Sequence, residues 1–162
     1  MDDSLIDDVD ARLLVLLQEN SQRTHVELAR DVGLSPAAVH KRLKRLREDG
    51  PIERFTVLLD RHALGLNLLC FIELRFKHNM SPVNRESLIA TLSGFPEVLE
   101  CFTLTGDNDA IMKVVVRDQE HLKVFVQGLA EAQDVIERIR TALALEEYKS
   151  TTALPVAQRG SA

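Results

Sequence analysis

The first third of the chain carries apolar residues at helical spacing in three short blocks. Within residues 8–20, apolar side chains recur three or four positions apart and so form one buried stripe along a helix. They are Val9, Leu13, Leu16 and Leu17. A similar pattern returns in residues 24–32 and again from Ser35 to about Asp49. This spacing predicts three helices.

Residues with strong preferences for helix ends separate the three predicted helices. Thr24 and Glu27 have the spacing of a capping box, in which each side chain satisfies a free backbone donor of the other residue. Gly33 is expected to end the second helix, because glycine readily adopts the left-handed conformation common there. Ser35 and Pro36 suit the N-cap and first position of the third helix. Three short helices with a tight glycine turn before the third predict a helix-turn-helix.

The rest of the chain alternates between strand and helix patterns. A β-like stretch is expected from Ile52 to Leu59, followed by a polar turn. The later elements are expected in the order βαββαβ over residues 66–77, 82–93, 97–105, 109–117, 118–131 and 135–147. That order is typical of a ferredoxin-like sandwich. The predicted fold class is therefore α+β: an N-terminal winged helix-turn-helix over residues 1–59, a linker over 60–65, a ferredoxin-like domain over 66–154 and a flexible tail over 155–162.

The net charge of −5 argues against a nucleic-acid partner, but the distribution of the charge matters more. Acidic residues gather in residues 1–10, whereas residues 40–47 hold five cations and no acid. On a helical wheel of about 100° per residue, Val39, Leu43 and Leu46 face inward, and small and basic residues lie opposite them. Small residues permit close approach to base edges, and cations reach phosphates or guanine.

We therefore predict a DNA-binding face on the third helix, although a solvated basic face on a structural helix is the alternative. The predicted face consists of Ser35, Pro36, Ala37, Ala38, His40, Lys41, Lys44 and Arg45.

The turn Thr105-Gly106-Asp107-Asn108-Asp109 is a second candidate site. Its residue types are common in hairpin turns, so an ordinary turn is one interpretation. An effector-binding site is the other, because two carboxylates can hold an ammonium group while backbone N–H groups near the glycine hold a carboxylate. Physical reasoning from the residues leaves both open.

Other chemistry finds little support in the sequence. Cys70 and Cys101 lie in apolar runs outside any ligand-spaced cluster and are expected to be reduced core thiols. The five histidines lack metal-binding spacing, and no phosphate-binding loop or nucleophile motif occurs. We therefore expect no catalytic or metal-binding residues, no cofactor and no enzyme activity. The acidic start and the lack of a long apolar run predict a cytoplasmic protein without membrane contact.

Three segments resemble the Lrp/AsnC family of feast/famine transcriptional regulators, and the resemblance extends from about residue 5 to 154. They are Ile6–Leu14, Gly33–Val39 together with the basic residues 41–46, and Glu100–Asp109. The resemblance implies a sequence-specific regulator that binds double-stranded DNA and responds to an amino acid or related small metabolite. It also implies homodimers that pair through the C-terminal domain and often form octamers, with the effector bound between dimers near Gly106.

Two positions depart from the family pattern. Pro51 stands where the family usually has an apolar residue, so the wing strand is expected to begin later. Asn108 replaces a commonly larger or aromatic residue and leaves the identity of the effector open. Two other functions compete: an enzyme like the family-related tetrapyrrole decarboxylases, and a DNA-binding assembly protein without an effector. The concentration of basic residues on the third helix favours DNA binding.

Overall fold

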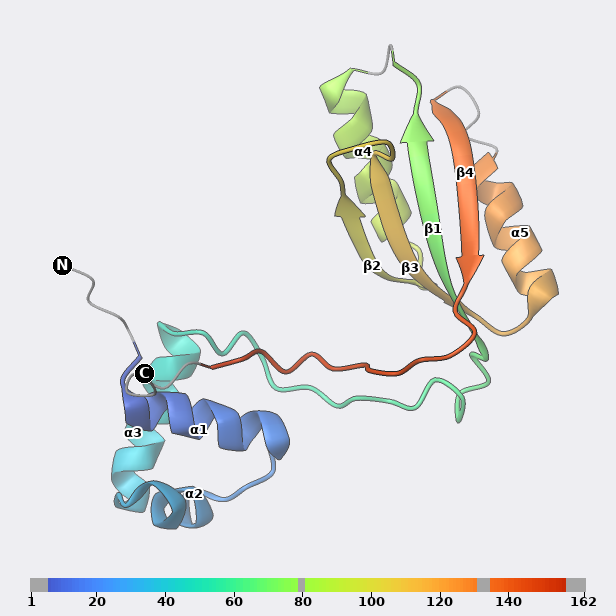
Figure 1. The fold of residues 1–162 in the computed structure, drawn as a ribbon. Coiled ribbons are helices and arrows are strands. Elements are labelled where there is room, and N and C mark those ends of the chain that lie inside the picture. The colour runs from blue at the N-terminus through green and yellow to red at the C-terminus, as the bar shows by residue number, and fades with distance from the viewer. Residues whose placement is uncertain (1–5, 79–80, 131–134, 157–162) are drawn as a thin grey trace. The chain divides into compact units, whose positions relative to one another are not determined.

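The computed structural model describes residues 6–78, 81–130 and 135–156. The chain forms two compact units, residues 1–58 with 150–162 and residues 59–149, and Figure 1 draws both. Among the described residues, the first unit is helical and the second holds a four-stranded sheet with two helices. The predicted α+β class is confirmed.

The first unit is built from α1 (Asp8–Glu19), α2 (His25–Val32) and α3 (Pro36–Glu48). The helix ends lie where the sequence signals predicted them. The Thr24 hydroxyl accepts a hydrogen bond from the Glu27 amide, and the Glu27 carboxylate accepts one from the Thr24 amide. Gly33 has a φ of 69°, in the left-handed region, and turns the chain from α2 into α3.

The three helices enclose an apolar core around Leu13, Leu28 and Val39, whose exposed fractions are all 0%. Burial of each such side chain stabilises the fold by about 1.5–3 kcal/mol. Ile52 packs against this core, and its amide donates to the Leu46 carbonyl at 3.0 Å. The core therefore holds α3 against α1 and α2 and also holds the first residues after α3.

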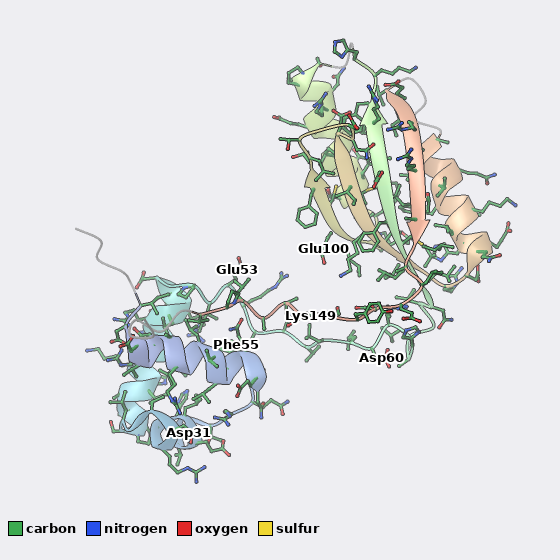
Figure 2. All side chains as sticks on the ribbon, viewed as in Figure 1. Asp31, Glu53, Phe55, Asp60, Glu100 and Lys149 are labelled. Carbon is green, nitrogen blue, oxygen red and sulfur yellow. The ribbon has the colours of Figure 1, made fainter. Side chains whose placement is uncertain are left out.

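The wing strand predicted from Ile52 to Leu59 is wrong: in the described chain no strand occurs between α3 and residue 68. The side chains of Phe55, Val57 and Leu59 are 52%, 75% and 71% exposed, and Figure 2 labels Phe55 on this segment. An alternating apolar pattern favours an extended backbone, but a strand also needs a neighbour that shares its hydrogen bonds. This segment has no such neighbour within the described chain.

The end of the described chain belongs to the helical unit. The Gln18 amide group donates to the Leu154 carbonyl at 3.0 Å, and its oxygen accepts from the Leu154 amide at 2.6 Å. The second domain predicted from the sequence extends to residue 154, whereas residues from 150 onward group with the first unit. Most of the tail expected over 155–162 lies outside the described residues.

The second unit follows the predicted order of elements. They are β1 (Leu68–Phe76), α4 (Pro82–Ser93), β2 (Val98–Thr103), β3 (Ala110–Val116), α5 (Gln119–Ala130) and β4 (Ile136–Leu143). The sheet order is β2-β3-β1-β4 and every neighbouring pair is antiparallel, which is the ferredoxin-like arrangement. β4 ends at Leu143, before the predicted residue 147, because the antiparallel pairing with β1 stops there.

Both helices of the second unit cover the same face of the sheet (Figure 1). Ile72 and Leu74 of β1 are fully buried and share a core with Leu92 of α4 and Phe125 of α5. Phe71 points to the opposite face and is 38% exposed. One face of the sheet is thus filled by the helices, and the other is left to solvent within the single chain.

Candidate DNA-binding face and effector turn

The start of α3 presents small residues to solvent. The Ser35 hydroxyl accepts a hydrogen bond from the Ala38 amide at 3.2 Å, so Ser35 is the N-cap, and Pro36 is the first helical residue. Ser35, Pro36 and Ala37 are exposed, and Ala38 is half-buried. The side chains at this end of the helix are small, and small side chains permit a close approach to base edges.

The remaining predicted DNA-binding residues lie on the exposed surface of α3. Val39 and Leu46 are buried, which orients the helix as the wheel predicted. His40, Lys41, Lys44 and Arg45 are exposed and follow the small residues along the helix. The structure therefore brings all eight predicted residues onto the surface of one helix and its cap.

Several of the cations on α3 have acidic partners. The sequence pattern, with no acid within residues 40–47, had predicted that they would have none. Arg42 donates to Asp7 at 2.6 Å and to Asp10 at 2.9 Å, and Arg45 donates to Asp10. Lys44 lies 4.0 Å from Glu48. The acids on α1 are more than thirty positions away in sequence, so a count within residues 40–47 missed them.

Sequence reasoning also missed the role of Asp7 and Asp10, which form a capping box at the start of α1. The Asp10 amide donates to the Asp7 carboxylate at 2.8 Å. This bond, with that from Arg42, holds the pKa of Asp7 below its ordinary value, and the two carboxylates in turn raise the pKa of Arg42. The Asp-x-x-Asp spacing just before an apolar stripe was the available signal.

A histidine pair lies between α2 and α3. The rings of His25 and His40 meet edge to face, with centroids 5.2 Å apart. His40 was predicted to lie on the DNA-binding face, whereas His25 was not singled out, because fifteen positions separate the two in sequence. The pair joins the start of α2 to the exposed surface of α3.

The candidate effector turn joins β2 to β3. The Leu104 amide donates to the Asp109 carbonyl at 2.9 Å and closes the loop. Gly106 has a φ of 118°, a conformation that residues with a Cβ rarely adopt. Thr105, Gly106 and Asp107 are exposed, so their backbone groups and the Asp107 carboxylate face solvent.

The two carboxylates of this turn have different surroundings. Asp109 accepts a hydrogen bond from the Phe76 amide at 2.8 Å and lies 3.2 Å from the Arg85 guanidinium, so both of its oxygens are engaged. Asp107 makes no hydrogen bond or ion pair with the residues that the structure describes. Within one chain, Asp107 is thus the carboxylate of the turn that remains available to a ligand.

Asn108 is fixed to the open face of the sheet. Its amide nitrogen donates to Glu73 at 2.8 Å, and its oxygen accepts from Arg138 at 3.1 Å. Glu73, Arg85 and Arg138 were not predicted as residues of the turn. They come from β1, α4 and β4, and no local motif indicated that they would meet there.

The described residues offer neither a metal site nor a membrane-spanning helix. No group of three or more His, Cys, Asp or Glu side chains is placed to hold a metal ion in residues 6–78, 81–130 and 135–156. Over the same ranges, no helix has the length and apolar character needed to span a membrane.

Both units match known protein families. Residues 6–47 match the AsnC-type helix-turn-helix domain, and residues 69–154 match the Lrp/AsnC ligand binding domain. The HTH-type transcriptional regulator FL11 of Pyrococcus furiosus is 33% identical over 94% of this chain and 97% of its own. The transcriptional regulator AzlB of Bacillus subtilis is 32% identical over 94% of this chain and 96% of its own.

Solved structures agree with these matches. A transcriptional regulator from Neisseria meningitidis in complex with L-Met has a TM-score of 0.86, is 33% identical and covers 93% of this chain and 96% of its own. An AsnC family regulator from Agrobacterium tumefaciens has a TM-score of 0.87 at 33% identity, over 93% of this chain and 97% of its own. Two domains in the same order, each matched to the same family, leave one assignment: the chain belongs to the Lrp/AsnC family of transcriptional regulators.

Proposed function

We propose that this protein is a sequence-specific, non-enzymatic regulator that reads DNA with α3 and responds to an amino acid or related small metabolite. The observation that carries the DNA part is the surface of α3, where exposed small residues at the N-terminus are followed by exposed cations. A helix with this order can place its first turn against base edges while its cations meet phosphates. We propose a cytoplasmic location for this regulator, in the compartment that holds the DNA it would bind.

The effector part of the proposal rests on the turn between β2 and β3. Asp107 is exposed and can take an ammonium group, and the backbone around Gly106 can take a carboxylate. The second domain matches a ligand binding domain, and the similar Neisseria meningitidis regulator was solved with L-Met. An α-amino acid carries both charged groups that this turn suits.

We further propose that the protein acts as a homodimer that assembles to an octamer. The sheet face away from α4 and α5 exposes Phe71 and Phe102, at 38% and 53%. A second copy packed face to face would cover these rings. A symmetric dimer also presents two copies of α3, which suits half-sites spaced by a multiple of about one helical turn of DNA.

The test measures, by fluorescence anisotropy at several salt concentrations, how tightly the full-length protein binds DNA from upstream of its own gene. We expect the double variant Lys41→Gln, Lys44→Gln to bind more weakly, with the salt dependence of log K reduced by about 0.9 for each lost phosphate contact. Lys123→Gln, on α5, is the matched control and should bind like the wild type.

The same assay, repeated with each of the twenty amino acids, tests the effector. One of them should shift DNA affinity roughly 5–150-fold, the usual range of effector coupling. For the DNA-binding test, equal affinity for DNA of the variant Lys41→Gln, Lys44→Gln and of the wild type would contradict the proposed DNA-binding face. An absorbance scan of the purified protein for bound tetrapyrrole tests the competing enzyme function.

A further inference from the structure

We propose that Asp10 is a positioning residue for DNA binding, because its buried carboxylate holds Arg45 in the orientation in which the guanidinium meets DNA. The inference rests on the proposed function of α3 as the DNA-reading helix. It assigns a role in that function to an acidic residue of α1, a helix that none of the DNA contacts predicted above involves.

Asp10 is the one buried charged residue among those that the structure describes, with 0% of its surface exposed. A buried carboxylate is stable only when its oxygens are paired. One oxygen of Asp10 accepts from Arg42 at 2.9 Å, and the other accepts from Arg45 and from the Asp7 amide. Both side-chain partners come from α3, so Asp10 ties α1 to the proposed DNA-reading helix.

The two arginines held by Asp10 differ in what they leave open. Arg42 is shared between two carboxylates, Asp7 at 2.6 Å and Asp10 at 2.9 Å, and its side chain is 28% exposed. The side chain of Arg45 is 48% exposed, and its hydrogen bond to Asp10 uses only one terminal nitrogen. A guanidinium carries five N–H donors in a rigid plane, so Arg45 keeps donors for a second partner. Arg42 fixes α3 to the start of α1. Arg45 is held by Asp10 at one terminal nitrogen, and the other N–H groups of its guanidinium can bind DNA.

This arrangement has a consequence for affinity that opposes simple charge reasoning. A free arginine side chain must be ordered when it binds, and an arginine already held in place avoids much of that entropic cost. A carboxylate near DNA, by contrast, repels phosphates, so its removal should strengthen binding if charge alone mattered. The two explanations predict opposite signs for the same substitution at Asp10.

The experiment measures binding of full-length Asp10→Asn to the DNA used above, by anisotropy at a temperature where circular dichroism shows native helix content. We expect binding about tenfold weaker than wild type, within the range for loss of one specific contact. Asp31→Asn is the matched control. It removes one carboxylate from an ion pair in the same unit, with Arg23 at 2.6 Å, but does not touch α3. Its affinity should equal or exceed that of the wild type.

A double-mutant cycle separates positioning from a general loss of structure. Arg45→Ala should weaken binding about tenfold, and adding Asp10→Asn to Arg45→Ala should weaken it no further. If Arg45→Ala weakens binding while folded Asp10→Asn binds at least as well as wild type, the positioning role is overturned and DNA binding by α3 stands. If neither Arg45→Ala nor the lysine double variant changes affinity, the proposed function itself has failed.

Arg45→Lys provides the same test should Asp10→Asn not fold. It keeps the positive charge and leaves the pair of Asp10 with Arg42 intact, but an ammonium lacks the planar fork that joins Asp10 to a second partner. We expect weaker binding with an unchanged salt dependence of log K. Wild-type affinity in Arg45→Lys would overturn the proposal.

Discussion

The carboxylate of Asp109 accepts a hydrogen bond from the backbone amide of Phe76 at 2.8 Å, across 33 positions of sequence. This bond ties the end of the turn between β2 and β3 to the last residue of β1. The neighbouring carboxylate, Asp107, is exposed and makes no such contact with the described residues. Two acids in one short turn are therefore expected to have different roles, one structural and one in binding.

Asp109→Ala should destabilise the second domain by about 1–3 kcal/mol, because the Phe76 amide then lacks its acceptor. Asp107→Ala should change the free energy of unfolding by less than about 0.5 kcal/mol, as is usual for an exposed site. Urea unfolding followed by circular dichroism measures both. A larger loss of stability in Asp107→Ala than in Asp109→Ala would show that Asp109 does not hold the turn to β1.

Asp107→Ala is expected instead to abolish binding of the amino acid that shifts DNA affinity. The reason is that Asp107 is the carboxylate of the turn left free for an ammonium group in the single chain. Titration calorimetry of the wild type and the variant with that amino acid checks this. Equal affinities would show that Asp107 is not its ligand.

Stability of the helical unit should depend on the ionisation of Asp7. The hydrogen bond from the Asp10 amide and the ion pair with Arg42 hold the pKa of Asp7 below its ordinary value of 3.8. A carboxyl whose pKa is lower in the folded state stabilises the fold above the unfolded pKa, and that contribution is lost as the pH falls through the folded pKa. Asp7→Asn should therefore be less stable than wild type at neutral pH, and the difference should shrink below pH 3.8.

Thermal melts at a series of pH values measure this difference. Val57→Ala, which removes no ionisable group from the exposed segment after α3, provides a control whose difference in stability from wild type should stay nearly constant with pH. If the difference in stability between Asp7→Asn and the wild type stays constant down to the lowest pH, ionised Asp7 does not stabilise the helical unit.

Cys70 should resist thiol reagents in the folded protein. Its side chain is fully buried in β1, and burial raises the pKa of the thiol above its ordinary value of 9.0. The thiolate is the reactive species, so both exclusion and protonation protect Cys70. In Cys101→Ser, which leaves Cys70 as the remaining cysteine, labelling at mildly alkaline pH should proceed only as fast as the domain unfolds. Immediate labelling without denaturant would contradict the burial.

Phe71→Glu should convert the proposed dimer to a monomer. A charge at this exposed ring, on the sheet face away from the helices, cannot be buried against a second copy without a large desolvation cost. Val124→Glu makes the same kind of change, from an apolar to an acidic side chain, on the exposed surface of α5. It should leave the mass of the assembly in solution unchanged. Sedimentation at micromolar concentration distinguishes the two. A dimeric Phe71→Glu would place the interface elsewhere.

Local signals in the sequence were enough to predict most of the elements. Thr24 and Glu27 cap α2, Gly33 ends it in the left-handed conformation, and Ser35 caps α3, as predicted. Each signal works within a few residues, because caps and turns satisfy backbone groups of the same segment. The βαββαβ order followed in the same way from alternating and helical periods.

The sequence by itself thus determined the helix ends, the order of elements, the buried faces and the surface of α3 that carries the predicted DNA-binding residues. Only the tertiary structure decided which charges on that surface are free, because Arg42 and Arg45 find their acids on another helix. It also decided that Asp109 serves the fold and that the segment after α3 is not a strand. These outcomes depend on partners far away along the chain. Periodicity predicts which face of a segment is buried, but it does not predict which distant residue contacts that segment.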